Sequence, residues 1–409
     1  MMGKGNSGFS ASGLRRMRDV LAGYVDSGRI PGLVALVARG DETHVEAIGT
    51  MGVDGGAPMR RDAVFRMAST SKPVGIAAGM VLLDECRLRL DDPVAPWLPE
   101  LADRQVLRKI GSPLDDTVPA RRPITVRDVL NCTFGLGMDL ASMGTPIQGA
   151  IQELGLTGQG GPQPAPDEWM RRLGTLPLMY HPGQQWAYHI GSDLLGVLVA
   201  RVTGQSYGTF LRERVFEPLG MEDTAFHVPE DKIHRLPPSY VPDPRTGEFI
   251  VWDEAAGGRY SRPPEFQSGG GGLVSTVDDY HAYFRMLLNE GTHGRERVLS
   301  RPAVQLMTTN CLTAEQEAVR SAQARDSVQI SFGQGQQGGW GLGMAVRTYR
   351  GDYAPVGQFG WDGGTGTTAY ADPREGVIGI LLTQVCLSVP DPARLAQDFW
   401  TTVYQAIED

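Results

Sequence analysis

Apolar and polar positions follow regular patterns at both ends of the chain. Apolar residues recur every three or four positions over about 12–27 and over 391–407, which predicts an amphipathic helix at each end. The segments 31–40 and 375–385 are continuous apolar runs, and each predicts a buried strand. The alternation in 44–49 predicts a further strand that pairs with the first one as a hairpin.

The middle of the chain has a different pattern. From about residue 91 to 235, helical periodicity is interrupted by Pro and Gly. Strands at both ends with helices between them predict an α/β (α+β) fold. We expect a discontinuous α/β lobe of residues 1–90 and 236–409, a mainly helical lobe of residues 91–235, and an active site between the lobes. Two glycine-rich stretches, 155–166 and 268–276, are predicted loops near that site, because glycine permits close backbone approach.

Composition narrows the class of protein. The chain has 409 residues, of which 41% are hydrophobic, so it can bury a large core. A formal net charge of −9 argues against a nucleic-acid partner, since phosphate binding needs clustered Lys and Arg. No apolar stretch is long enough for a membrane span, and the start of the chain lacks a signal-peptide pattern. We therefore expect no membrane partner and a cytoplasmic location.

The spacing of cysteine and histidine gives no sign of a metal site. The four cysteines lie far apart in the sequence, which favours free, mostly buried thiols in a reducing compartment. The seven histidines are scattered and form no His-x-x-x-His pair. Neither a metal nor another cofactor is expected.

Ser69 and Lys72 are the leading candidates for chemistry. They precede a helical run, 73–86, and follow an apolar strand-like run, 63–68. Residues three apart at the start of a helix share a face, so a buried, neutral lysine can take the proton of the serine hydroxyl. The helix N-terminus also offers backbone N–H groups to a developing oxyanion. Taken alone, however, this spacing is more typical of an N-cap serine with a surface lysine.

The sequence around Ser69 resembles a known nucleophile segment. Residues 65–74 (FRMASTSKPV) are similar to that segment in class C β-lactamases and in the related carboxylesterases of the β-lactamase/penicillin-binding-protein fold. Further segments resemble landmarks of this family in the same order: 124–136, 181–207, 215–226, 269–288, 340–346 and 360–373. The resemblance runs from about residue 12 to the C-terminus. It implies an antiparallel sheet flanked by N- and C-terminal helices, plus a helical lobe.

The resemblance also implies roles for individual residues. Ser69 is the expected nucleophile, and Lys72 and Tyr188 are jointly the expected general bases. Trp361 stands where the lysine of the family's Lys-Thr-Gly box would be, as in the esterase relatives. The N–H groups of Ser69 and Gly364 are then expected to form the oxyanion hole, although another alignment would use the Trp361 N–H instead.

Two departures from the β-lactamase pattern bear on the substrate. Ile190 stands where β-lactamases carry an asparagine that binds the amide arm of the substrate, and Trp361 replaces a lysine. The residues expected to contact the substrate are Trp361, Gly363, Ile190, Met138 and Trp340. We therefore expect a serine carboxylesterase that acts on a small ester or amide through an acyl-enzyme on Ser69.

Other functions use the same serine. A β-lactamase or D-amino-acid peptidase would differ in its acyl donor, and an acyltransferase would replace water with another acceptor. A non-catalytic binding member of the fold is a further alternative, although it would have no need for Ser69, Lys72 and Tyr188 together. The sequence predicts neither the natural substrate nor the oligomeric state.

A second serine motif occurs at residues 204–208. This Gly-Gln-Ser-Tyr-Gly sequence fits the nucleophile elbow of α/β-hydrolases, which requires a strand before the serine and a helix after it. An apolar helical run precedes it instead, so we expect a helix–turn–helix with Ser206 near an N-cap.

Overall fold

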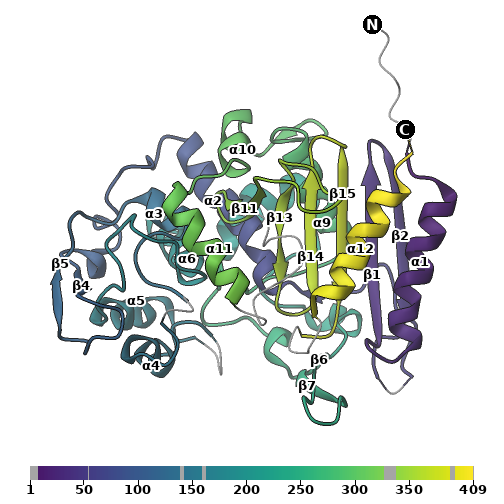
Figure 1. The fold of residues 1–409 in the computed structure, drawn as a ribbon, viewed down its shortest axis with the longest axis horizontal. Coiled ribbons are helices and arrows are strands. Elements are labelled where there is room, and N and C mark those ends of the chain that lie inside the picture. Colours follow the sequence, from purple (N-terminus) through teal and green to yellow (C-terminus); the bar gives the residue numbers. More distant parts are fainter. Residues whose placement is uncertain are drawn as a thin grey trace, which may run out of the picture.

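A seven-stranded antiparallel sheet occupies one half of the molecule, on the right-hand side of Figure 1. The computed structural model describes residues 8–53, 55–138, 142–158, 163–326, 338–386 and 392–408. The strands, in sheet order, are β11 (Gly338–Trp340), β12 (Ala345–Arg347), β13 (Phe359–Gly363), β14 (Thr367–Asp372), β15 (Val377–Thr383), β1 (Gly32–Arg39) and β2 (Glu42–Gly49). Strands from the two ends of the chain meet where β1 pairs with β15. The predicted N-terminal hairpin is confirmed as β1–β2, and the predicted C-terminal strand as β15.

The terminal helices cover one face of this sheet. Helices α1 (Ala11–Asp26) and α12 (Pro392–Ala406) lie side by side there, purple and yellow in Figure 1. Met17 of α1 and Phe399 of α12 share a hydrophobic cluster with Leu33 of β1. Both terminal helices predicted from the sequence are therefore confirmed, as is their position against the sheet.

The opposite face of the sheet packs against a second layer. Val34 and Leu36 of β1 belong to the main core, together with residues of α2 (Ser71–Asp84) and α9 (Val277–Leu288). Neighbouring side chains of a strand point to opposite faces, so β1 is covered on both sides and all its residues are buried. This explains why its sequence is a continuous apolar run rather than an alternating one.

Short helices make up most of the middle of the chain. They are α3 (Val126–Leu130), α4 (Pro146–Glu153), α5 (Pro166–Thr175), α6 (Ile190–Thr203), α7 (Tyr207–Leu211), which continues as a π-helical turn over Arg212–Phe216, and α8 (Glu217–Leu219). Further described elements include β4 (Gln105–Leu107), β5 (Thr117–Pro119), β6 (Ser239–Pro242), β7 (Phe249–Asp253), β9 (Thr292–His293), β10 (Glu296–Arg297), α10 (Arg301–Met307) and α11 (Ala314–Asp326). The α/β fold class is thus confirmed, while the exact lobe boundaries stay a prediction.

A short strand pair lies next to the glycine-rich stretch 268–276 and includes part of it. Strand β3 (Phe65–Arg66) pairs with β8 (Val274–Ser275) and thereby places the turn at residues 269–271 beside the start of α2. The strand-like run predicted for 63–68 contains only these two strand residues. The extended conformation ends after Arg66, because Met67 has helical angles (φ −78°, ψ −21°) and Ala68 has a φ of 45°.

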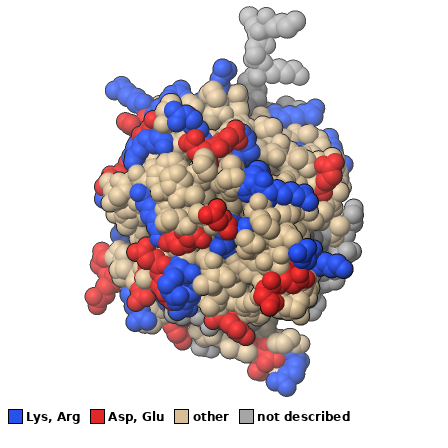
Figure 2. All heavy atoms as spheres, turned by 90° about the vertical axis from the view of Figure 1, so that its left-hand side faces the viewer, with Lys and Arg blue, Asp and Glu red and all other residues tan. Residues whose placement is uncertain are grey.

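Charged side chains are mixed on the surface. Figure 2 shows acidic and basic groups interspersed on the face formed by the end of the molecule that carries β4 and β5. No helix within the described ranges is both long and apolar enough to span a bilayer. All four cysteines are free; Cys132 is buried, but Cys86 is exposed, so the expectation of mostly buried thiols is wrong for that residue.

Candidate active site

Ser69 and Lys72 lie together at the start of α2. Ser69 belongs to a 3-10 turn, Ala68–Thr70, that runs directly into the helix, and Lys72 lies one turn further on. The Lys72 side chain is fully buried, and its Nζ lies 3.1 Å from Ser69 Oγ. The predicted nucleophile and base are therefore within hydrogen-bond reach of each other.

The surroundings of Lys72 favour a neutral amine. Burial lowers the pKa of Lys72 to about 8, although the nearby carboxylate of Asp193 acts in the opposite direction. The Nζ group donates a hydrogen bond to the Gly270 carbonyl oxygen (2.6 Å) and contacts His189 Nδ1 at 3.2 Å. A larger fraction of this amine is neutral near pH 7 than for an exposed lysine, so it is available as a base.

Tyr188 approaches the same pair of residues from the segment before α6. Its backbone exchanges two hydrogen bonds with Met138, of 2.8 and 3.0 Å, which fix the tyrosine against a second segment of the helical region. Its ring centre lies 4.4 Å from Lys72 Nζ. Burial raises the pKa of Tyr188 well above its usual value, although the interactions of its phenol with the nearby Ser69 hydroxyl and with Trp361 act in the opposite direction. The phenol is therefore protonated at neutral pH.

Three tryptophans surround Tyr188. Trp361 Nε1 donates a hydrogen bond of 2.6 Å to the phenol oxygen. Trp340 packs edge-on against Trp361 with ring centres 4.7 Å apart, and Trp186 lies against both Tyr188 and Trp340. The guanidinium of Arg320, itself buried, lies 5.4–6.0 Å from the three indole rings. This aromatic cluster holds the tyrosine in one position.

The predicted substrate contacts are mostly inaccessible. Trp340 and Ile190 have no exposed surface, and Trp361 and Gly363 are also buried; of the five, Met138 alone keeps part of its surface exposed. Trp340 and Ile190 present no surface to a ligand in this structure, and their contact with a substrate stays a prediction. Trp361 instead contacts Tyr188.

The burial of Ile190 has a local backbone cause. His189 has φ 79° and ψ −64°, and Ile190 N donates to Tyr188 O across 3.2 Å, which is a γ-turn. In an extended segment the residue two positions after Tyr188 would point to the same side as the tyrosine. The turn removes that relationship, so Ile190 begins α6 with its side chain in the main core.

The β13–β14 hairpin lies against the residues that precede Ser69. Thr365 and Thr367 donate hydroxyl hydrogen bonds to the carbonyl oxygens of Arg66 and Met67. The predicted oxyanion residue Gly364 is exposed and occupies the turn of this hairpin. Strand β12 pairs with residues 359 and 360 of β13. The edge of β13 beyond residue 360 is therefore not paired with β12 and faces the segment that carries Ser69.

Sequence reasoning missed His189 and Asp193. His189 Nε2 lies 3.5 Å from Asp193 Oδ2, and the Asp193 carboxylate, fully buried, also accepts hydrogen bonds from the Ser268 hydroxyl, the Gly270 N–H and the Gln163 amide. Burial alone would raise the pKa of Asp193, but His189 and these hydrogen bonds together hold it below its usual value. The signal available in the sequence was the four-residue spacing of His189 and Asp193 at the start of a predicted helix.

The second serine motif is structural. Ser206 is the N-cap of α7, and its Oγ accepts a hydrogen bond from Thr209 N at 3.1 Å. Helix α6 enters the motif and ends at Gly204, which has a φ of 74°. The predicted helix–turn–helix is confirmed, and the strand that a nucleophile elbow requires is replaced by a helix.

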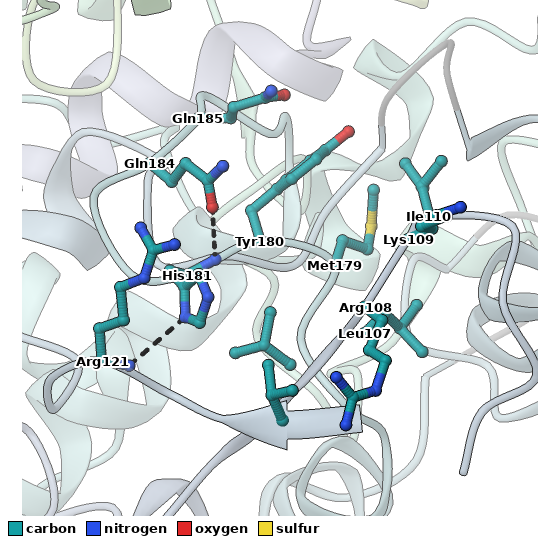
Figure 3. A pocket seen from close by; sticks show the side chains of 12 residues that line it. Leu107, Arg108, Lys109, Ile110, Arg121, Met179, Tyr180, His181, Gln184 and Gln185 are labelled. Atoms are coloured by element: carbon teal, nitrogen blue, oxygen red, sulfur yellow. Dashed lines mark hydrogen bonds between the residues drawn. The ribbon is translucent and has the colours of Figure 1, made fainter. Parts of the chain in front are cut away.

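A cavity of about 420 Å³ lies beside β4, β5 and the segment that leads to Tyr188. Figure 3 shows Arg108, Lys109, Arg121 and His181 among the side chains around it. The described residues that line it do not include Ser69, Lys72 or Tyr188. The groups capable of acyl transfer are therefore outside this cavity.

Comparisons with known proteins identify the family and the fold. The model of the Beta-lactamase family matches residues 17–397. Protein Rv1367c of Mycobacterium tuberculosis is 39% identical over 380 residues, which are 91% of this chain and 90% of that protein. Esterase EstB of Burkholderia gladioli is 34% identical over 267 residues, which are 61% of this chain and 64% of EstB. The solved structure of EstCE1, described as a hydrolase with promiscuous acyltransferase activity, has a TM-score of 0.78 and 24% identity over 97% of this chain and 98% of that one, and thus shares its fold.

Proposed function

The chain belongs to the β-lactamase family, and we propose that it is a serine esterase that cleaves carboxylic esters through an acyl-enzyme on Ser69. The relationship to EstB supports a serine hydrolase of this fold. The observation that carries the proposal is the buried Lys72, whose Nζ lies 3.1 Å from Ser69 Oγ. A buried amine at this distance can activate a serine hydroxyl, which is a weak nucleophile on its own.

The described groups divide the acylation step between them. Lys72, as the neutral amine, takes the proton of Ser69, whose Oγ attacks the ester carbonyl carbon. When the tetrahedral intermediate collapses, the phenol of Tyr188 gives its proton to the leaving alkoxide and regains one from the Lys72 ammonium. Water then attacks the acyl-enzyme by the reverse route and releases the acid. This division follows from the pKa values, because the pKa of Lys72 is lowered to about 8 while that of Tyr188 is raised.

The hairpin register supports Gly364 rather than Trp361 as the second oxyanion donor. Gly363 pairs with Thr367, Gly366 N donates to Gly363 O across 3.0 Å, and Gly366 has a φ of 80°, which together describe a three-residue hairpin loop. The pair that closes such a loop is hydrogen-bonded, so the Gly363 amide points at β14, as does that of Trp361 two residues earlier. The Gly364 amide is then free of that ladder and acts with the Ser69 amide.

The cationic side chains near β12 and β13 do not suit a β-lactam carboxylate. Arg347 has a side chain only 1% exposed and is ion-paired with Asp352 at 3.1 Å. Arg350 donates hydrogen bonds to the backbone of its own loop. Trp361 uses its only polar group on Tyr188. An ester without a carboxylate needs no cationic partner and so loses no binding energy here. The arrangement therefore favours esters over β-lactams.

Acyl transfer is the second candidate. It shares the acyl-enzyme and differs only in that an alcohol or amine replaces water in the second step. Product analysis with p-nitrophenyl butyrate separates the two functions: an esterase releases butyric acid even with added methanol or benzyl alcohol, whereas a transferase forms mainly the new ester. The proposal as a whole is tested by the same assay with Ser69→Ala, which is expected to abolish p-nitrophenol release.

A further inference from the structure

His189 contacts both Lys72 and a buried carboxylate. Its Nδ1 lies 3.2 Å from Lys72 Nζ, and its Nε2 lies 3.5 Å from Asp193 Oδ2. When Lys72 donates to Nδ1, that nitrogen is unprotonated and any ring proton is on Nε2, which faces the carboxylate. Of the seven histidines, this one joins the proposed base to a fully buried negative charge.

The backbone at His189 is held in an unfavourable conformation. Its φ of 79° lies in a region that residues other than glycine rarely adopt. The γ-turn it forms is strained and persists only where the surroundings impose it. Glycine would form this turn without strain, so the backbone does not account for an imidazole at this position.

The glycine turn opposite leaves room for this imidazole. A Cβ atom on Gly270 would lie 2.8 Å from His189 Cε1 and 3.0 Å from Asp193 Oδ1. Gly270 also contacts the two residues on either side of the imidazole. Its N–H donates a hydrogen bond to Asp193, and its carbonyl oxygen accepts one from Lys72. The side chain of His189 is 13% exposed and that of Asp193 is 0% exposed, so solvent has little part in this contact.

We propose that His189 and Asp193 form a proton-accepting pair for Lys72. A proton moves from Lys72 Nζ to His189 Nδ1, so that one N–H bond breaks and another forms, and the net charge of the three side chains is unchanged. Lys72 becomes the neutral amine that Ser69 needs, and the imidazolium faces the Asp193 carboxylate. Lys72 therefore acts as a base without first losing its proton to solvent. This inference rests on the proposed Ser69–Lys72 mechanism, and His189 and Asp193 are positioning residues that act through Lys72.

Other titratable groups around the three side chains stay neutral in the relevant pH range. Tyr188 and Cys132 face Lys72, and Tyr207 lies near Asp193. Burial raises the pKa of Cys132 to about 11 and raises those of both tyrosines further. These three neighbours therefore do not change charge near neutrality.

The test is the pH profile of kcat/KM for p-nitrophenyl butyrate. His189→Asn tolerates the left-handed backbone and can still accept a hydrogen bond from Lys72, but it cannot take up a proton. We expect the midpoint of the acidic limb to move up by about one pH unit or more, so that activity falls at least about tenfold at low pH and stays near wild type at high pH. His181→Asn is the matched control, because His181 lies outside the site. This variant should leave the pH profile of kcat/KM unchanged.

A second variant keeps the test valid if His189→Asn misfolds. His189→Gly suits the observed φ and leaves space for free imidazole. Added imidazole should restore activity at low pH in this variant, and should fail to do so when Asp193→Asn is also present. A loss by the same factor at every pH, or a profile equal to wild type, would overturn the inference while leaving the proposed function intact. Activity that does not depend on Ser69 would instead overturn the proposed function.

Discussion

The indole N–H of Trp361 donates a hydrogen bond of 2.6 Å to the phenol oxygen of Tyr188. The resemblance to β-lactamases places a lysine at position 361, which would bring a second positive charge beside Lys72. The indole supplies one donor with no charge and fixes the phenol beside Ser69. The replacement therefore changes the electrostatics of the site while keeping a hydrogen-bond donor there.

Removal of this donor should slow catalysis without unfolding the protein. Trp361→Phe keeps a large aromatic ring but loses the hydrogen bond, and a neutral hydrogen bond contributes about 1 kcal/mol, so kcat should fall by about five- to tenfold. Trp340→Phe is the matched control, since the Trp340 N–H has no hydrogen-bond partner among the described residues. Steady-state kinetics of both variants test this prediction. An equal loss of kcat in the two variants would show that packing alone, and not the hydrogen bond, causes the loss.

Lys72 and Tyr188 should each be essential to the rate. Lys72→Arg keeps a permanent positive charge and cannot accept the proton of Ser69, and Tyr188→Phe cannot protonate the leaving group. Each should lower kcat by about a hundredfold or more, which is the usual scale of lost acid–base help. Rates near wild type in either folded variant would remove that residue from the mechanism.

The burial of Lys72 should also appear in the stability of the protein. Its pKa is lowered from 10.5 to about 8, so between these pH values the unfolded chain binds a proton that the folded chain does not. The free energy of unfolding should therefore rise with pH across this window, by about 3 kcal/mol relative to Lys72→Met. Urea denaturation of both proteins at about pH 7.5 and pH 10.5 measures this difference, and a difference that is independent of pH would show that Lys72 is not desolvated.

Esters should be better substrates than β-lactams. A buried amide or carboxylate left without its partner costs about 1–3 kcal/mol or more, and a cephalosporin carries both groups. We expect kcat/KM for a short p-nitrophenyl ester to exceed that for a chromogenic cephalosporin by at least about a hundredfold. Comparable efficiencies on one preparation would contradict the esterase proposal and leave the fold unaffected.

Sequence patterns predicted the fold because burial and periodicity are local properties. The continuous apolar run at 31–40 requires a strand covered on both faces, which is what β1 is. The pairing of Lys72 with His189 depends instead on how α2 and α6 meet in space. The burial of Ile190 follows from a strained γ-turn at His189, and no local preference of histidine predicts that turn.

The central claim is that Ser69 is the nucleophile, and covalent labelling tests it most directly. The wild-type protein, Ser69→Ala and Ser206→Ala are incubated with a fluorophosphonate probe, digested and examined by peptide mass spectrometry. The account predicts one adduct on Ser69 in the wild type and in Ser206→Ala, no adduct in Ser69→Ala, and loss of ester hydrolysis in that variant alone. An adduct on Ser206, or full hydrolysis by Ser69→Ala, would contradict it.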